Sequence, residues 1–323
     1  MLPAAMPRDL AGSNQGPLRI IANPRAGQGR GRKRADRLAV ELHRIGLPCT
    51  IAFTEGSGHA QQLAAAAAGP VVVVGGDGTV HEVVNGLVAR DGSLGPLAVL
   101  PSGSGDDFAA NARFPADPAA LAEQLRRATL RAIDVGAAEI ECERGRVHRR
   151  FANNLGLGFE AEVALAAART RWLRGRWLYL AATLKALRHQ RSVDCTIECK
   201  STQGTHEQGN GSIDERRPLL FASICNGGTV GGGLCFSPDA RIDDGMFDVL
   251  TVGSASRTRT LALLLRLLRR NHLFDPRVRL TRCVAASIVP SEPVACAMDG
   301  EGIAARVTAV RAGVAEQRLL LFV

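Results

Sequence analysis

The chain has 323 residues, 46% of them hydrophobic, and its formal net charge at pH 7 is +9. A chain of this length usually forms two domains with substantial hydrophobic cores. No apolar run approaches the roughly 20 residues that a membrane-spanning helix requires. The eight cysteines include no C-x-x-C pair, which favours reduced, buried thiols over a zinc site.

The N-terminus has no basic start followed by an apolar segment, so we expect no secretory signal. Residues 1–17 are expected to form a flexible polar leader. Reduced thiols and the missing signal together predict a cytoplasmic location.

Strands alternate with helices through the first part of the chain. Short apolar segments at 18–22, 48–54, 71–74 and 97–100 predict strands, and each is followed by a turn-forming segment and a helix. This alternation predicts an α/β domain with a parallel sheet over residues 18–133. In such sheets ligands bind at the carboxyl ends of the strands, where these turns lie.

The segment 71–82 carries the strongest local signal. Four consecutive valines predict a strand that is buried on both faces. Glycines precede and follow Asp77, and their lack of a Cβ lets a ligand approach the backbone. Thr79 and Glu82 have the spacing of a capping box, and the helix that begins there would direct free N–H groups at the turn. A well-capped strand-to-helix connection would explain Thr79 and Glu82 but not the glycines, so we predict a phosphate site.

Beyond Asp134 the pattern changes to short segments of alternating hydrophobicity. They predict an antiparallel, β-rich, sandwich-like domain over residues 134–308, with residues 309–323 as a candidate for a return to the first domain. The expected strands are 147–155, 193–200, 219–226, 246–252 and 278–289, the expected helices are 161–191 and 258–271, and the loosest loop is expected at 201–217.

The positive charge is concentrated in two segments of this second domain. Seven basic residues and no acidic one lie between residues 163 and 193, and five basic residues and no acidic one lie between 249 and 274. Both segments also carry Leu or Trp, which favours docking to an anionic membrane surface over binding of nucleic acid. Ordinary solvated helix faces are the alternative.

The first glycine turn, Gly75-Gly76-Asp77-Gly78-Thr79, resembles the nucleotide-binding signature of the diacylglycerol kinase catalytic domain family. That family includes sphingosine kinases, ceramide kinases and bacterial lipid kinases, and it is distantly related to NAD kinases and phosphofructokinases. The segments 23–27 and 100–109 resemble its other nucleotide loops. Asp106 stands where the family usually has Asn, and its charge would oppose ATP unless a cation or Arg113 offsets it.

The resemblance implies an NAD kinase-like fold for the first domain, with ATP and Mg²⁺ as cofactors. His81 is a second departure, since bacterial members more often have Asn there. The implied nucleotide-binding residues are Asn23, Pro24, Arg25, Ala26, Gly27, Thr54, Gly75, Gly76, Asp77, Gly78, Thr79, Val80, His81, Glu82 and Ser104.

The resemblance also assigns catalytic roles. Glu301 would be the base that accepts the proton of the attacking hydroxyl, with Asp299 orienting it or assisting the metal. An ordinary β-turn is the alternative for this pair, and a domain-linking aspartate without a catalytic role is the alternative for Asp134. The implied catalytic set is Glu301, Asp299, Asp77, Asp107 and Asp134.

The acidic segment 237–249 resembles one that holds a structural Mg²⁺ in bacterial members of the family. Carboxylates and exposed carbonyls suit a hard cation. The implied ligands are the carboxylate of Asp244 and the main-chain oxygens of Arg241 and Met246. A metal-free acidic turn is the alternative.

Together these features predict an ATP-dependent kinase that phosphorylates the hydroxyl of a membrane lipid, with diacylglycerol, converted to phosphatidic acid, as the leading acceptor. We expect such a protein to associate peripherally with the inner face of the membrane and to bind no nucleic acid. A homodimer is left open. The alternatives are a soluble NAD kinase-like enzyme and a non-catalytic regulator that binds lipid or nucleotide.

Overall fold

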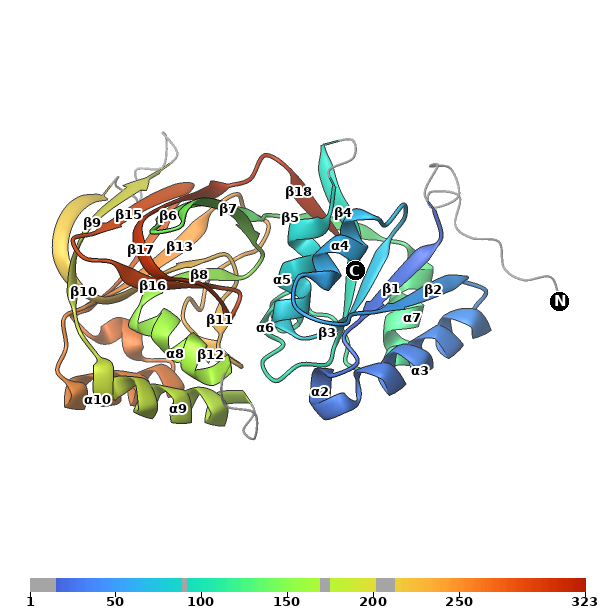
Figure 1. The fold of residues 1–323 in the computed structure, drawn as a ribbon, viewed down its shortest axis with the longest axis horizontal. Coiled ribbons are helices and arrows are strands. Elements are labelled where there is room, and N and C mark those ends of the chain that lie inside the picture. The colour runs from blue at the N-terminus through green and yellow to red at the C-terminus, as the bar shows by residue number, and fades with distance from the viewer. Residues whose placement is uncertain (1–15, 89–91, 169–174, 202–212) are drawn as a thin grey trace. The chain divides into compact units, whose positions relative to one another are not determined.

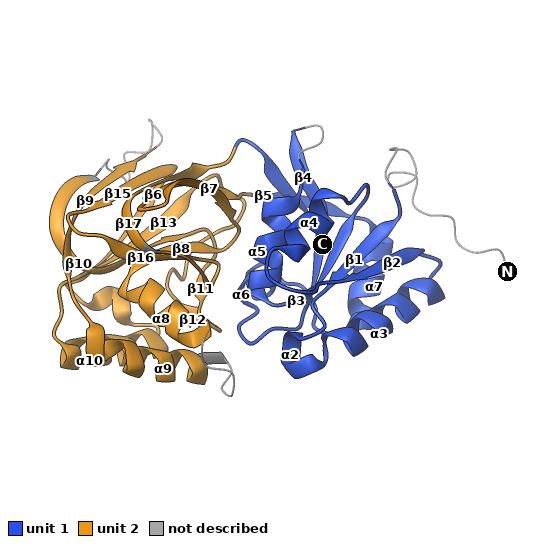
Figure 2. Cartoon of the chain, in the orientation of Figure 1, with its two compact units in different colours: residues 1–133, 316–323 blue, residues 134–315 orange. Residues whose placement is uncertain are grey.

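The computed structural model describes residues 16–88, 92–168, 175–201 and 213–323 (Figure 1). The chain forms two compact units, one of residues 1–133 with 316–323 and one of residues 134–315 (Figure 2). Nearly all of the expected leader lies outside the described residues.

A six-stranded sheet with the order β2-β1-β3-β4-β18-β5 forms the centre of the first unit. β1 (Leu18–Ala22) pairs in parallel with both β2 (Cys49–Phe53) and β3 (Val71–Gly75). β4 (Ser93–Pro101) continues the parallel set beside β3. All of β3 is buried, as a continuous run of valines predicts for a strand that is covered on both faces.

The end of the chain supplies another strand of this sheet. β18 (Arg318–Phe322) pairs in parallel with β4 and antiparallel with β5 (Leu130–Ile133). Its Leu319 and Leu321 are buried, so packing in the sheet core accounts for the return. The return begins at residue 316 rather than 309, because the preceding strand continues in the second unit as far as Val314.

Helices follow the parallel strands, as the alternation in the sequence predicts. α3 packs against α7, and α4 packs against α5. In α5 the apolar stripe at Val80, Val83 and Val84 is buried, which is the arrangement expected of an amphipathic helix on a sheet. The helices of this unit are α2 (Ala26–Gly29), α3 (Gly31–Arg44), α4 (His59–Ala65), α5 (Asp77–Gly86), α6 (Asp107–Asn111) and α7 (Pro118–Arg127).

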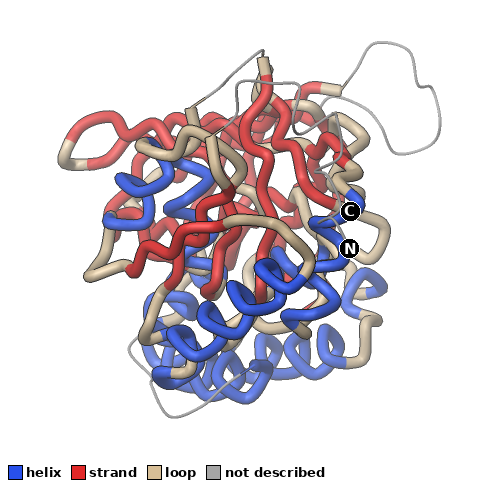
Figure 3. The backbone as a smooth tube through the Cα atoms, turned by 90° about the vertical axis from the view of Figure 1, so that its right-hand side faces the viewer, coloured by secondary structure: helices blue, strands red, loops and turns tan. Residues whose placement is uncertain are grey.

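The second unit is built on a ten-stranded sheet that closes on itself. The closure depends on β10 (Ile213–Cys225), whose first part pairs with β9 (Val193–Lys200) and whose second part pairs with β8 (Asn154–Gly158) and β13 (Phe247–Gly253). Figure 3 shows the strands and helices of the whole backbone in separate colours. The expected fold class, a parallel α/β domain followed by an antiparallel β-rich domain, is confirmed.

The remaining strands of the second unit complete that sheet or form a short hairpin beside it. They are β6 (Gly136–Cys142), β7 (Gly145–Phe151), β14 (Val278–Cys283), β15 (Ala285–Pro290), β16 (Val294–Met298) and β17 (Glu301–Val314), with the hairpin of β11 (Thr229–Val230) and β12 (Leu234–Cys235).

Several expected elements have different bounds in the structure. The segment 147–155 contains the end of β7 and the start of β8, and 278–289 contains β14 and most of β15. Neither break carries a glycine or proline, so the sequence lacks the usual turn signal there. Of the expected loop, residues 213–217 belong to β10, and 202–212 lie outside the described residues. β6, β16 and β17 were not predicted.

Three helices lie along one side of the strands of the second unit (Figure 1). They are α8 (Phe159–Ala168), α9 (Gly175–Ala186) and α10 (Arg257–Leu268), with short 3₁₀ turns η1 (Leu187–His189) and η2 (His272–Phe274). The expected helix 161–191 is therefore divided into α8 and α9, and residues 169–174 between them lie outside the described part. In the part of the chain that is described, no helix is long and apolar enough to span a bilayer.

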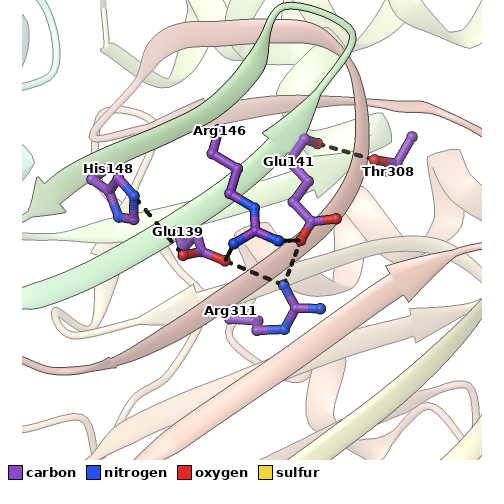
Figure 4. Close-up of polar contacts among 6 residues, drawn as sticks. All are labelled: Glu139, Glu141, Arg146, His148, Thr308 and Arg311. Atoms are coloured by element: carbon purple, nitrogen blue, oxygen red, sulfur yellow. Dashed lines mark hydrogen bonds and ion pairs between the residues drawn. The ribbon is translucent and has the colours of Figure 1, made fainter.

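An exposed ion-pair network joins β6, β7 and β17 (Figure 4). The Arg311 guanidinium lies 2.8 Å from the Glu141 carboxylate and 3.4 Å from that of Glu139, and Arg146 contacts both acids at 3.3 and 3.7 Å. Pairs this exposed contribute about 0–1 kcal/mol each. The network therefore fixes strand pairing only weakly. All eight cysteine thiols are free, as expected.

Candidate active site

Three predicted nucleotide loops lie at the carboxyl ends of neighbouring strands in the first unit. Asn23 follows β1, the glycine turn at 75–77 follows β3, and the segment 102–106 follows β4. Thr54 follows β2, and its N–H donates to the carbonyl of Ala22 at 2.9 Å. Because β2, β1, β3 and β4 are adjacent and parallel, the sheet brings these loops to one edge.

Two glycines from different loops touch at this edge. A Cβ on Gly76 would lie 2.8 Å from the Cα of Gly103, and a Cβ on Gly103 would lie 2.5 Å from the Cα of Gly76. Real Cβ atoms do not approach other atoms this closely, so only glycine fits at either position without a shift of the backbone. The two loops are consequently held together by backbone contact.

Asp77 connects the same two loops. It is the first residue of α5, and its Oδ1 accepts a hydrogen bond of 3.0 Å from the N–H of Phe108 at the start of α6. Burial and the neighbouring Asp107 raise the pKa of the Asp77 carboxyl well above its usual range. The turn thus concentrates negative charge, which a cation bound by phosphates would relieve.

Asp106 has a left-handed backbone and adds a third carboxylate to this turn. Its Oδ1 accepts a hydrogen bond of 2.8 Å from the N–H of Gly103. Burial raises the pKa of Asp106, while this N–H and the charge of Arg34 oppose the rise. The sequence left open a cation or Arg113 as the group that offsets Asp106, and Arg34 of α3 supplies such a positive charge.

Arg34 also ties α3 to the loop after β4. Its Nε donates to the buried hydroxyl of Ser102 at 2.8 Å, and its Nη2 donates to the carbonyl of Ala116 at 2.6 Å. The start of α3 lies close to the end of β1. A Cβ on Gly31 would clash with the carbonyl of Asn23, so the close approach requires glycine there. The sequence predicted neither contact of Arg34, with Ser102 or with Ala116.

Glu82 does not form a capping box with Thr79, contrary to the sequence prediction. Its two carboxylate oxygens accept hydrogen bonds from the N–H groups of Gly58 and Ala60, at 2.7 and 3.0 Å. Those groups belong to the N-terminus of α4, where a negative charge is favourable. α4 and α5 pack together, so Glu82 caps the neighbouring helix instead of its own.

The other predicted nucleotide residues of the first unit surround the same edge. The Asn23 side chain donates to the Thr79 hydroxyl at 3.5 Å, which joins the first loop to the second. His81 is buried on α5 beside Asn85, and Ser104 is exposed. Pro24, Arg25, Ala26 and Gly27 form the turn into α2, with Gly27 in the left-handed region at φ +61°.

In the second unit Asp299 braces the turn between β7 and β8. Its carboxylate accepts hydrogen bonds from three main-chain N–H groups, those of Ala152 at 3.1 Å, Asn153 at 2.8 Å and Asn154 at 3.1 Å. Asp299 is buried and has a positive φ of 48°, followed by Gly300 at 81°. Two consecutive positive φ values between paired strands make a type I′ hairpin turn, which Asp-Gly favours. The hairpin turn therefore explains the presence of Asp299 and Gly300 better than the sequence suggested.

Glu301 follows this turn as the first residue of β17, opposite Met298. Its side chain is exposed. An exposed carboxylate directly after this turn is accessible to a substrate, which a catalytic base requires. Its role as the base stays a prediction.

Asp134 opens the second unit and holds the acidic segment. Its Oδ2 accepts a hydrogen bond of 2.6 Å from the N–H of Gly245, and its own N–H donates to the carbonyl of Ile242 at 2.7 Å. The Asn226 side chain donates to the carbonyls of both Asp134 and Ala152, at 2.9 and 2.8 Å. Asp134 and the turn braced by Asp299 thus belong to one hydrogen-bonded assembly.

The implied ligands of a structural Mg²⁺ are engaged with protein groups. One oxygen of Asp244 forms an ion pair with Arg282, and the other accepts a hydrogen bond of 3.1 Å from the N–H of Met246. Arg282 also lies 3.4 Å from Asp248. Among the described residues there is no cluster of three or more acidic, His or Cys side chains suited to a metal. Arg282 thus already pairs with the one carboxylate of the implied ligand set, so the Asp244 side chain does not fit a structural cation, while the parts of Arg241 and Met246 stay predictions.

The second unit also contains an apolar cavity that the sequence did not reveal. Its empty volume is about 890 Å³, with the open solvent at its mouth included. α8, α9 and α10 form one wall and the face of β8, β10 and β13 forms the other. Leu220, Phe236, Leu250 and Leu263 line its apolar part, and Asn154, Glu160 and Gly300 line its polar part.

Comparisons with known proteins agree with these features. The family described as "Diacylglycerol kinase catalytic domain" matches residues 17–138, and the "YegS C-terminal NAD kinase beta sandwich-like domain" matches residues 153–321. A "Diacylglycerol kinase" of Mycobacterium tuberculosis is 28% identical over 299 residues, covering 88% of this chain and 91% of the relative. A "Probable lipid kinase YegS-like" of Chromohalobacter salexigens is 29% identical over 226 residues, covering 69% and 66%.

A solved structure shows the same fold. The crystal structure of a diacylglycerol kinase from Bacillus anthracis str. Sterne has a TM-score of 0.66 and 18% identity, and the match covers 96% of this chain and 97% of that one. The two family matches together extend over most of the chain, and they meet near the division between the units. The chain therefore belongs to the diacylglycerol kinase and YegS-like family of lipid kinases.

Proposed function

We propose that the protein transfers the γ-phosphoryl group of ATP to the hydroxyl of a membrane lipid, with diacylglycerol as the leading acceptor. The observation that carries the proposal is the apolar cavity of the second unit, which reaches Gly300, the residue immediately before Glu301. A cavity lined mainly by apolar side chains suits acyl chains, and the neighbouring carboxylate suits deprotonation of a hydroxyl at their polar end.

The loops of the first unit supply the nucleotide side of the reaction. The free N–H groups at the start of α5 and the loops at 23–27 and 102–106 would bind the phosphates. Asp77 and Asp107 are the carboxylates that suit a Mg²⁺ bound mainly by nucleotide phosphates, since such an ion needs only one or two protein ligands. When bound, Mg²⁺ spreads the charge that develops on the phosphoryl oxygens.

In the second unit two residues of the hairpin between β16 and β17 have different roles in the proposed reaction. Glu301 accepts the proton of the attacking hydroxyl. Asp299 is a positioning residue, because its three hydrogen bonds hold the β7–β8 turn that borders the cavity. The reaction thus uses Glu301 for proton transfer and Asp299 for the shape of the site.

A peripheral association with an anionic membrane forms part of the proposal. α9 and α10 both line the cavity, and a hydrogen bond of 3.0 Å from Arg257 of α10 to the carbonyl of Arg188 joins α10 to the η1 turn that follows α9. Their outer faces expose Trp177, Leu184 and Leu265 among basic side chains. Exposed apolar residues beside arginines suit the interface of a bilayer that faces the cytoplasm.

The direct test is a kinase assay with purified protein and radiolabelled ATP. The acceptors are diacylglycerol, monoacylglycerol, ceramide, a sphingoid base and phosphatidylglycerol in mixed micelles, with NAD in a parallel reaction. We expect label in phosphatidic acid. Label only in NADP would assign the protein to the soluble NAD kinase type, and no label in any acceptor would favour a non-catalytic regulator.

A further inference from the structure

A carboxyl group lies buried against the middle of the sheet in the second unit. Glu160, in the first turn of α8, extends over Gly156 of β8, and a Cβ at Gly156 would clash with both carboxyl oxygens. The strand neighbours of Gly156 are the small residues Ser223 and Ala297. Because Gly156, Ser223 and Ala297 are small, the Glu160 side chain has room between the sheet and the helices.

The hydrogen bonds of this carboxyl group are incomplete. Its Oε1 accepts a bond of 2.8 Å from the side-chain amide of Asn154, which also lies 3.3 Å from the Ser223 hydroxyl. Two oxygens, Oε2 of Glu160 and Oδ1 of Asn154, are buried. Neither has a hydrogen-bond partner among the described residues. Proteins rarely leave two such atoms unpaired side by side, because each costs free energy on burial.

Both residues line the apolar cavity, and their unpaired oxygens are buried at its wall. The polar end that they form is next to the predicted catalytic turn, because the carbonyl of Asn154 accepts a hydrogen bond of 2.9 Å from the N–H of Asp299. Gly300 lines the cavity at the same end. A lipid with its chains in the apolar part would therefore place its headgroup against Asn154 and Glu160.

We propose that Glu160 and Asn154 bind a hydroxyl group of the acceptor lipid and select lipids that carry one. This inference rests on the proposed function and adds two specificity residues to it. The unpaired atom of Asn154 is an acceptor, so it requires a donor from the ligand. Ester carbonyls cannot donate, whereas the hydroxyl can donate to Asn154 and accept from a protonated Glu160 while the lipid binds. Glu301 takes the same proton only later, when the phosphoryl group is transferred.

The state of Glu160 is compatible with this role. Burial raises the pKa of its carboxyl to about 7, while the neighbouring Ser223 and Asn154 side chains favour the charged form. Near neutral pH the group is therefore present in both forms. It can accept from the hydroxyl or donate to it.

The test compares two lipids that differ only in the hydroxyl. The probes are 1,2-dioctanoylglycerol and its 3-deoxy analogue, each titrated into the full-length protein in detergent without ATP, with tryptophan fluorescence or calorimetry as the readout. We expect the wild-type protein to bind the hydroxyl lipid roughly tenfold more tightly or better, because the analogue leaves buried polar atoms unpaired. In Glu160→Met and Asn154→Leu the preference should fall below roughly threefold.

Controls separate binding from folding. Glu162→Gln lies on the same helix but does not line this cavity, and it should keep the wild-type preference. Glu160→Gln retains the shape of the side chain, and it should fold and keep part of the preference even where Glu160→Met does not fold. In the kinase assay the KM for the lipid should rise in the Met and Leu variants while the KM for ATP stays unchanged.

Equal binding of the two lipids by the wild-type protein would overturn the inference. A full preference retained in both Asn154→Leu and Glu160→Gln would also overturn it. Failure of the proposed function would give a different result. The kinase assay would then label no lipid, and this outcome does not depend on the binding preference measured without ATP.

Discussion

Gly76 and Gly103 meet through their backbones, and each occupies the space that a side chain on the other would need. The contact joins the turns after β3 and β4, which carry Asp77 and Asp106. Two loops separated in sequence by a helix and a strand are thus positioned by the absence of side chains. The family signature in this chain is therefore a packing requirement as well as a nucleotide motif.

The glycine contact predicts a loss of stability on substitution. Gly103→Ala should lower the free energy of unfolding by about 1–3 kcal/mol, because the backbone must shift to admit a Cβ. Urea denaturation measures the change. The control is Gly56→Ala, where a Cβ would meet nothing within 4 Å. Equal losses in the two variants would show that the contact is unimportant.

The capping role of Glu82 predicts an effect on stability. Glu82→Ala should lower the free energy of unfolding by about 1 kcal/mol, because two N–H groups at the start of α4 lose their acceptor. Denaturation and the KM for ATP are measured together. Glu55→Ala, an exposed residue ahead of the same helix, is the control. A raised KM for ATP at unchanged stability would contradict the capping role and favour a nucleotide contact.

The catalytic role of Glu301 predicts a loss of turnover. Glu301→Ala should reduce kcat roughly a hundredfold or more with the KM for ATP unchanged, because general base catalysis contributes on that scale. Glu198→Ala, also exposed on a strand of the second unit, should behave like the wild-type protein. Unchanged kcat in Glu301→Ala would remove Glu301 from this role.

Burial of Glu160 predicts a pH-dependent stability. The pKa is about 7 in the folded protein and near 4.5 when exposed, so the folded state binds more protons than the unfolded state between these values. Stability must then fall as the pH rises through this window. Glu160→Gln cannot ionise, so near pH 8 it should be more stable than the wild-type protein by about 1–3 kcal/mol, and near pH 4 the advantage should vanish. Chemical denaturation at a series of pH values checks this, and an advantage that does not vary with pH would contradict it.

The membrane-facing surface predicts a salt-dependent association with vesicles. Phe274 is 83% exposed just beyond α10, so Phe274→Asp combined with Leu265→Asp should reduce sedimentation with phosphatidylglycerol vesicles at least roughly tenfold. High salt should weaken wild-type binding, since the arginines contribute through electrostatics. Val40→Asp, at a similarly exposed apolar residue of the first unit, is the control. Equal binding by all variants would place the membrane contact elsewhere.

The sequence by itself determined the local elements that depend on neighbouring residues. The valine run predicted a buried strand, the glycines around Asp77 predicted its turn, and alternation predicted the two fold classes, because each depends on short-range periodicity and turn chemistry. The family resemblance added three predictions that the motifs alone do not make: ATP as a cofactor, Glu301 as the base and a lipid as the acceptor. Even locally there were errors, since neither the break between β7 and β8 nor that between β14 and β15 carries a glycine or proline.

Only the tertiary structure decided which distant groups meet. Glu82 caps α4, Arg34 partly offsets the charge of Asp106, β18 returns to the first sheet, and Glu160 fills the space above Gly156. Each pairing depends on how strands and helices pack across long separations in the chain, and no residue spacing records it. For the same reason the sequence could not show the apolar cavity, whose walls come from helices and strands that are far apart in the chain.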